Sequence, residues 1–216
     1  MSAEWILQGY TYDPKELAAF VGSKNVKLAK KIARAAKELH DDDRLEGTLE
    51  EIVIEIANKK LSRDRDMSYR IALEAIMNEL GDTIAFDVNA QSKRYKRLTT
   101  YGLKERLDEV LAALGQKTLA KAWQKGGVPF PTATLTCDAE DWPMAFALDA
   151  ATAAKAAKEA STLPKRADID ARARKTMKGD EDFAEDTADV VVVLAQIVTK
   201  AAKKKSAVMV LVDGEQ

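Results

Sequence analysis

Six apolar residues follow one another near the C-terminus, from Ala207 to Val212. A strand with one solvent-exposed face alternates apolar and polar residues. This run does not alternate, so we expect a strand whose two faces are both covered. Each large aliphatic side chain buried there contributes roughly 1.5–3 kcal/mol. We therefore predict that this strand lies at the centre of a small sheet around which helices pack.

The N-terminus predicts a partner for that strand. Apolar and aromatic residues occur in an extended pattern from Trp5 to Tyr12, and Gly9 within it is typical of a bulge. Apolar and polar residues also alternate in segments 82–90 and 132–137, which predicts a short strand in each. We expect segment 132–137 to be a middle strand of the sheet.

Helical periodicity and capping signals predict helix for most of the remaining chain. Asp13 and Pro14 suit a cap and the first helical position, and Thr48 with Glu51 forms a capping box. Apolar residues recur at helical spacing after such signals. The expected helices cover residues 14–21, 24–39, 49–56, 69–80, 101–114, 118–123, 150–160 and 187–202. The predicted fold is α+β: one helix-dominated domain, residues 1–216, on a small sheet that includes both terminal strands, with a candidate lobe boundary near 126–131.

Composition places the chain among ordinary globular proteins. Of its 216 residues, 46% are hydrophobic and 32% are charged, and the net charge is −1. A single cysteine, Cys137, cannot form an internal disulfide, which is typical of a reducing compartment. The start of the chain lacks a signal peptide, and the apolar run Val190–Ala195 is too short for a membrane span. We expect a cytoplasmic bacterial protein with no membrane contact and no cofactor.

Several residues of the first third of the chain carry a family resemblance. They are Tyr10, Tyr12, Asp13, Leu17, Gly22, Ser23, Tyr69, Ala72, Leu73, Glu74 and Gly81. Their order and spacing resemble a family of small uncharacterised bacterial proteins, a domain of unknown function with a helix-rich α+β layout. The resemblance covers roughly residues 1–81. It implies a fold but no catalytic residues.

Metal binding is one candidate chemistry, because His40 is followed by Asp41, Asp42 and Asp43. One imidazole and several carboxylates are suitable ligands, but a firm site needs ligands that converge from several directions. The chain has no second histidine, so a solvated turn after a helix is the competing interpretation. We do not assign a metal site.

Catalysis is the second candidate. Cys137 and His40 could meet in space, yet neither has a local nucleophile signature, and a half-buried inert thiol is the common alternative. Gly126-Gly127 precedes a proline-rich connector rather than a helix, which indicates a turn and not a phosphate loop. We expect a non-enzymatic protein, and an enzyme whose site is not visible in the sequence remains an alternative.

Nucleic-acid binding is the third candidate. A basic and aromatic segment between residues 93 and 106 contains Lys93, Arg94, Tyr95, Lys96, Arg97 and Tyr101. Cations contact phosphates and aromatic rings stack on unpaired bases. A second basic face lies along residues 24–37, and acidic segments elsewhere balance both.

Protein binding is the fourth candidate and the function that we predict. Charges are segregated into blocks, which steer association and select partners. The acidic-aromatic segment Asp138, Glu140, Asp141 and Trp142 is the predicted contact, with Trp123 and Phe146 nearby. We expect another bacterial protein as the partner, as for an immunity or regulatory protein.

Overall fold

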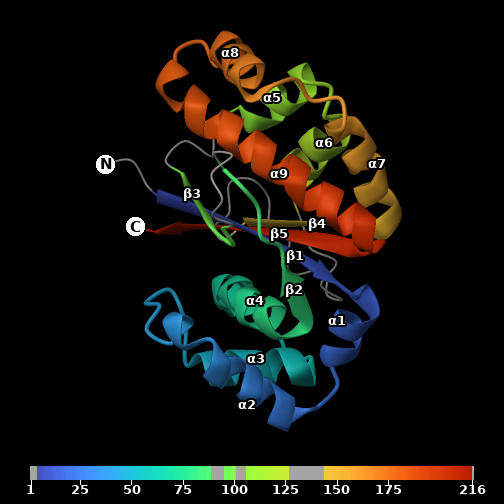
Figure 1. Ribbon diagram of the computed structural model, residues 1–216. Coiled ribbons are helices and arrows are strands. Elements are labelled where there is room, and N and C mark those ends of the chain that lie inside the picture. The colour runs from blue at the N-terminus through green and yellow to red at the C-terminus, as the bar shows by residue number, and fades with distance from the viewer. Residues whose placement is uncertain (1–3, 89–94, 101–105, 127–143, 216) are drawn as a thin grey trace.

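The computed structural model describes residues 4–88, 95–100, 106–126 and 144–215. Within these ranges, helices cover both faces of a central antiparallel sheet, which gives three layers (Figure 1). The fold is therefore α+β and helix-dominated, as the sequence predicts. No helix in the described ranges is long and apolar enough to cross a membrane.

The first half of the chain forms one helical layer and part of the sheet. Its elements are β1 (Glu4–Tyr12), α1 (Pro14–Phe20), α2 (Val26–Ala35), α3 (Leu49–Asn58), α4 (Asp66–Leu80), β2 (Gly81–Thr83) and β3 (Leu98–Thr100). The second half forms the opposite layer and the rest of the sheet. Its elements are α5 (Leu107–Ala113), α6 (Lys117–Lys125), β4 (Met144–Leu148), α7 (Ala150–Ala160), α8 (Arg166–Thr176), α9 (Ala184–Lys204) and β5 (Ala207–Glu215).

The two terminal strands lie side by side in the sheet. The strand order is β2-β1-β5-β4, with β3 paired to the other end of β1. Strands β1 and β5 are antiparallel, from Glu4 opposite Glu215 to Tyr12 opposite Ala207. The predicted pairing of the chain ends is therefore confirmed.

The two predicted strands between the chain ends have other outcomes. The strand predicted within 82–90 forms only at its start, where β2 ends at Thr83, and an isolated bridge between Phe86 and Tyr95 follows. The predicted middle strand at 132–137 lies outside the described residues. Strand β4 instead pairs with β5 on the side away from β1.

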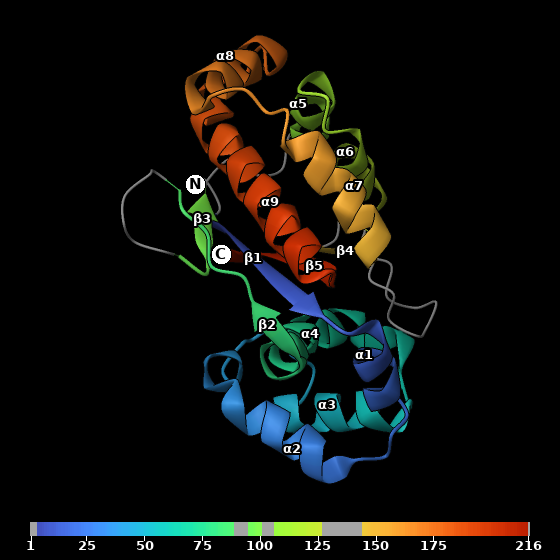
Figure 2. The same ribbon diagram turned by 45° about the vertical axis from the view of Figure 1, so that its right-hand side comes forward.

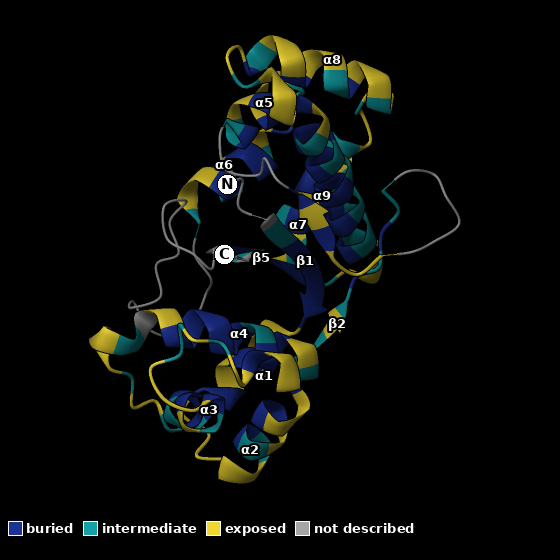
Figure 3. Ribbon diagram, turned by 90° about the vertical axis from the view of Figure 1, so that its left-hand side faces the viewer, coloured by how far each residue is buried: buried dark blue, intermediate teal, exposed yellow. Residues whose placement is uncertain are grey.

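Both faces of β5 are buried, as its continuous apolar run predicts. Val208, Val210 and Val212 pack into the core on the α9 side. Met209 and Leu211 pack into a second core with the helices α2, α3 and α4. Figure 3 shows this buried sheet between the two helical layers. The C-terminal strand thus contributes to both cores.

Helix α9 crosses the upper face of the sheet and is almost continuously buried on its inner side. Valine has an intrinsic preference for strands, but burial of the valines of α9 against the core outweighs this preference. Gly9 of β1 permits the close approach, because a Cβ there would lie 2.7 Å from Ile197 Cδ1. Gly9 is therefore a packing position between β1 and α9.

Candidate functional site

Helix α2 carries the most concentrated charge of its layer. Its N-cap, Asn25, accepts a hydrogen bond from the Leu28 N–H at 3.0 Å, which fixes the start of the helix. Ala29, Ile32 and Ala33 are buried against the rest of the layer. Because these residues occupy the inner face, the cations of α2 must lie on the outer face.

We call the outward cations on and beside this helix the α2 basic face. They are Lys24, Lys27, Lys30, Lys31, Arg34 and Lys37. Figure 2 shows α2 on the outside of its layer, farther from the sheet than α4. The basic block is visible in the sequence, and in the structure all of these residues except Lys30 are exposed.

The α2 basic face is grooved and partly apolar. A groove of about 520 Å³ is lined by Asn25, Lys27, Leu28, Lys30, Lys31 and Arg34. Val26, next to Lys27 in the sequence, is 38% exposed. The face therefore offers apolar contact within a ring of positive charge.

Carboxylates neutralise only part of this face. Lys31 Nζ lies 2.6 Å from Glu79 Oε1, and Lys30 Nζ lies 3.1 Å from Glu50 Oε1. Arg34 is 3.9 Å from the same Glu50. Exposed pairs of this kind contribute about 0–1 kcal/mol each, so a partner's carboxylates can replace them.

Three cations of the α2 basic face have no such partner. The side chains of Lys24, Lys27 and Lys37 form no hydrogen bond or ion pair with any residue in the described ranges. Positive charge on the face is therefore in excess of the acidic side chains that contact it.

A second polar cluster is buried between β1 and α4. Gln8 Nε2 donates to Glu74 Oε1 at 2.9 Å, and Arg97 Nη2 donates to the same oxygen at 2.9 Å. The Tyr10 hydroxyl lies 2.8 Å from Gln8 Oε1 and 3.0 Å from Asn78 Oδ1. These contacts join β1, α4 and the segment before β3.

Burial dominates the electrostatics of this cluster. It raises the pKa of the Glu74 carboxyl above its ordinary value, and the Gln8 and Arg97 contacts only partly oppose the rise. It raises the pKa of the Tyr10 hydroxyl as well, with the Glu74 charge adding to the effect. Raised carboxyl pKa values occur at active sites and in structural networks alike. Here the contacts with side chains of three segments favour a structural role.

Two of the candidate metal ligands, His40 and Asp42, are bound to different partners in the structure. His40 Nε2 lies 2.7 Å from the Ala33 carbonyl oxygen, so this nitrogen donates a proton and cannot ligate a metal in that state. Asp42 is bound by Arg44, with Nη2 to Oδ2 at 2.6 Å. In the described ranges no three acidic, histidine or cysteine side chains form a metal-binding group.

Arg44 instead connects the two halves of the chain. Its guanidinium also contacts Asp213 of β5, at 2.7 Å from Nη1 and 2.8 Å from Nη2. The bond from Arg44 holds the pKa of Asp42 below its ordinary value. Sequence reasoning missed this contact because 169 residues separate Arg44 from Asp213.

The predicted nucleic-acid segment is only partly described. Lys93, Arg94 and Tyr101 lie outside the described residues, whereas Tyr95 and Lys96 are exposed. The remaining cation, Arg97, binds Glu74 and lies 3.9 Å from Glu38. Its guanidinium is therefore already engaged with carboxylates.

The predicted protein contact, residues Asp138, Glu140, Asp141 and Trp142, lies outside the described residues, as does Cys137. The neighbouring aromatic residues belong to the core. Trp123 and Phe146 are buried and meet edge to face, with ring centroids 6.3 Å apart. These two rings therefore stabilise the core and are not surface anchors.

The fold and surfaces define an α+β protein with a sheet enclosed between two helical layers. Residues 4–203 match the family described as domain of unknown function DUF7691. The chain belongs to this family, and the match extends the resemblance seen over residues 1–81 to nearly the whole sequence. No curated protein and no solved structure matches the chain.

Proposed function

We propose that this chain is a non-enzymatic binding protein that docks the α2 basic face on an acidic surface of another protein. The observation that carries the proposal is the groove on α2, in which cations surround half-buried Leu28, with exposed Val26 two residues before it in the sequence. Interfaces combine an apolar centre with a polar rim, and complementary charge steers the encounter. An immunity or regulatory protein that occupies another bacterial protein in the cytoplasm fits this description.

The composition of the face favours a protein partner over nucleic acid. Exposed Val26 and half-buried Leu28 offer apolar contact, which a phosphate backbone does not use. Glu50 and Glu79 stand among the cations, where they would repel phosphates. An acidic protein surface with an apolar centre complements both features.

A pair of charge-reversal variants tests the proposal. Lys27→Glu/Arg34→Glu reverses two charges on the α2 basic face, whereas Lys155→Glu/Lys158→Glu makes the same change on exposed residues of α7. Proteins captured by the wild type from its source cells are identified, purified and titrated calorimetrically against all three chains. We expect the face variant to weaken binding at least about tenfold, and the α7 control to change it by less than about twofold.

Two results would count against the proposal. Equal affinity of the face variant and the wild type would remove the α2 basic face from the interface. Binding of a labelled DNA duplex by the wild type, lost in the face variant while no purified protein binds, would favour nucleic acid instead.

A further inference from the structure

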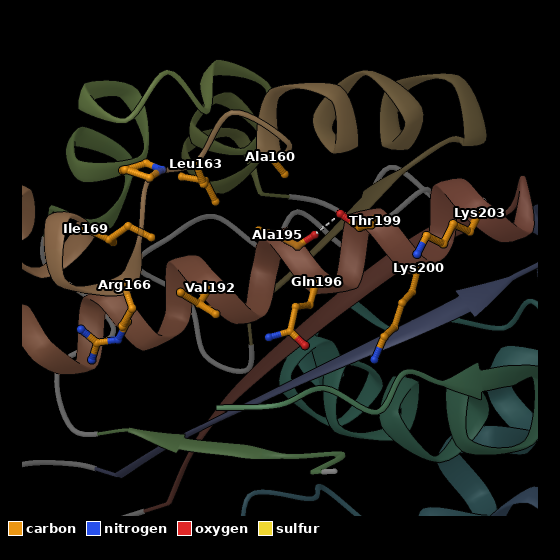
Figure 4. A pocket seen from close by; sticks show the side chains of 11 residues that line it. Ala160, Leu163, Arg166, Ile169, Val192, Ala195, Gln196, Thr199, Lys200 and Lys203 are labelled. Atoms are coloured by element: carbon orange, nitrogen blue, oxygen red, sulfur yellow. Dashed lines mark hydrogen bonds between the residues drawn. The ribbon is translucent and has the colours of Figure 1, made fainter. Parts of the chain in front are cut away.

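A second groove runs along α9, on the other side of the sheet from the α2 basic face (Figure 4). Its α9 wall is one helical stripe with the spacing i, i+3, i+4, i+7, i+8 and i+11: Val192, Ala195, Gln196, Thr199, Lys200 and Lys203. The opposite wall comes from the end of α7, the turn that follows and the start of α8, including Leu163 and Ile169. The groove encloses about 510 Å³.

Most polar groups that line the groove already have partners. Gln196 accepts from the Asp87 N–H at 2.9 Å and donates to the Asp87 carbonyl at 2.6 Å. Lys200 Nζ donates to the Ala85 carbonyl oxygen. Arg166 Nε donates to Asp189 at 2.7 Å. These side chains are held by other parts of the chain, and the rest of the lining is mainly apolar: Ala160, Leu163, Pro164, Ile169, Val192 and Ala195.

Lys203 differs from the other polar residues of the groove. Its side chain is exposed and makes no hydrogen bond or ion pair with the described ranges of the chain. Lys204 and Lys205 follow it, so three cations offset the partial negative charge at the end of a helix. One end of an apolar groove is therefore positively charged.

The dimensions favour a small occupant. Eleven residues line the groove, whereas a stable protein interface uses about 20–30 residues on each side. The volume lies within the range of about 300–1,000 Å³ that is typical of small-molecule sites. The stripe from Val192 to Lys203 is about 17 Å long at 1.5 Å per residue, which suits an extended chain rather than a compact ring system.

We propose that the α9 groove binds a free single-chain amphiphile with a carboxylate head group. The alkyl chain lies on Val192, Ala195, Leu163 and Ile169, and the carboxylate meets Lys203. This site is on a different layer from the α2 basic face, so either proposal can fail without the other.

Calorimetric titration with octanoate, decanoate and dodecanoate below their micelle-forming concentrations tests this site. Each added methylene that enters the groove should strengthen binding by about fourfold, from its contribution of about 0.8 kcal/mol. Dodecyltrimethylammonium, which carries the opposite charge, should bind more weakly than dodecanoate. Affinity that does not rise with chain length, or tighter binding of the cation, would overturn the proposal.

Variants locate the binding. Ala195→Met fills the groove without adding charge and should weaken dodecanoate binding at least about tenfold. Lys203→Glu, at an exposed position that leaves the fold intact, should weaken it by about fivefold or more, whereas Lys155→Glu on α7 serves as the control and should not. Unchanged affinity in Lys203→Glu, or an equal loss in Lys155→Glu, would contradict the assignment of the head group.

Discussion

Gly9 of β1 gives the sharpest test of how the sheet and α9 pack together. A Cβ at this position would lie 2.7 Å from Ile197 Cδ1, 2.8 Å from Cγ1 and 3.0 Å from Cγ2. Real Cβ atoms do not come this close, so Gly9→Ala must displace α9 or the Ile197 side chain. We predict that Gly9→Ala destabilises the protein through this one contact.

The magnitude follows from two opposing effects. Alanine restricts the unfolded chain and would stabilise the protein by about 0.4–1 kcal/mol where its conformation is allowed. Overpacking of a dense core costs about 1–3 kcal/mol. We therefore expect a net loss of about 1–2 kcal/mol in the free energy of unfolding.

A double-mutant cycle isolates the contact. Ile197→Ala removes all three atoms named above and should cost about 2–5 kcal/mol by itself. In that background Gly9→Ala should cost nothing or restore stability, because its methyl group enters the vacated space. Urea denaturation of the four proteins gives the coupling energy. A coupling energy below about 0.5 kcal/mol would refute the close packing of β1 on α9.

Three further predictions concern the polar clusters and the chain end. Burial raises the pKa of Glu74, so the unfolded chain releases this proton at lower pH than the folded protein. The stability that this group contributes is therefore present below the ordinary pKa and is lost as pH rises through the folded-state pKa. In urea denaturation between about pH 4 and 8, Glu74→Gln should flatten this decline in the free energy of unfolding. Parallel pH profiles of the variant and the wild type would contradict the prediction. Arg44→Ala leaves Asp42 and Asp213 without their cation and should cost about 1–3 kcal/mol by thermal melting, against less than about 0.5 kcal/mol for the exposed control Arg34→Ala. In the wild type, the lowered pKa of Asp42 adds stability above its ordinary pKa that is lost as pH falls, and Arg44→Ala should remove this dependence too. Deletion of residues 207–216 removes the strand paired with both β1 and β4, and should abolish cooperative unfolding followed by circular dichroism; a normal melting transition would show that β5 is dispensable.

Local signals predicted much of the helical structure. The capping box of Thr48 and Glu51 forms as expected at the start of α3. Helix α7 has the predicted bounds, Ala150–Ala160. Such signals involve residues that are close in sequence, so their consequences can be inferred without knowledge of the fold.

The missed elements lack a distinctive local pattern. Strand β4 is a short apolar run directly after an acidic segment, and its pairing with β5 is not visible in the sequence. Helix α8 buries few residues, Ile169 and Ala173 among them, so it has no long apolar stripe to reveal it. Helix α8 is stabilised mainly by packing against α9.

The candidate sites depended even more on distant contacts. The basic residues of α2 are visible in the sequence, but the groove and the exposure of Val26 are not. The α9 groove requires the turn after α7 to lie against α9, about thirty residues further along the chain. Charge could be predicted from composition, whereas concavity follows from tertiary packing.

Hydrogen exchange of the complex with the captured partner tests the central claim most directly. Amide exchange is compared by mass spectrometry in the free and bound chain, peptide by peptide. Docking on the α2 basic face predicts that slowed exchange is concentrated in peptides that cover residues 24–37. Slowed exchange at residues 138–142 or 93–106, with none at 24–37, would contradict it.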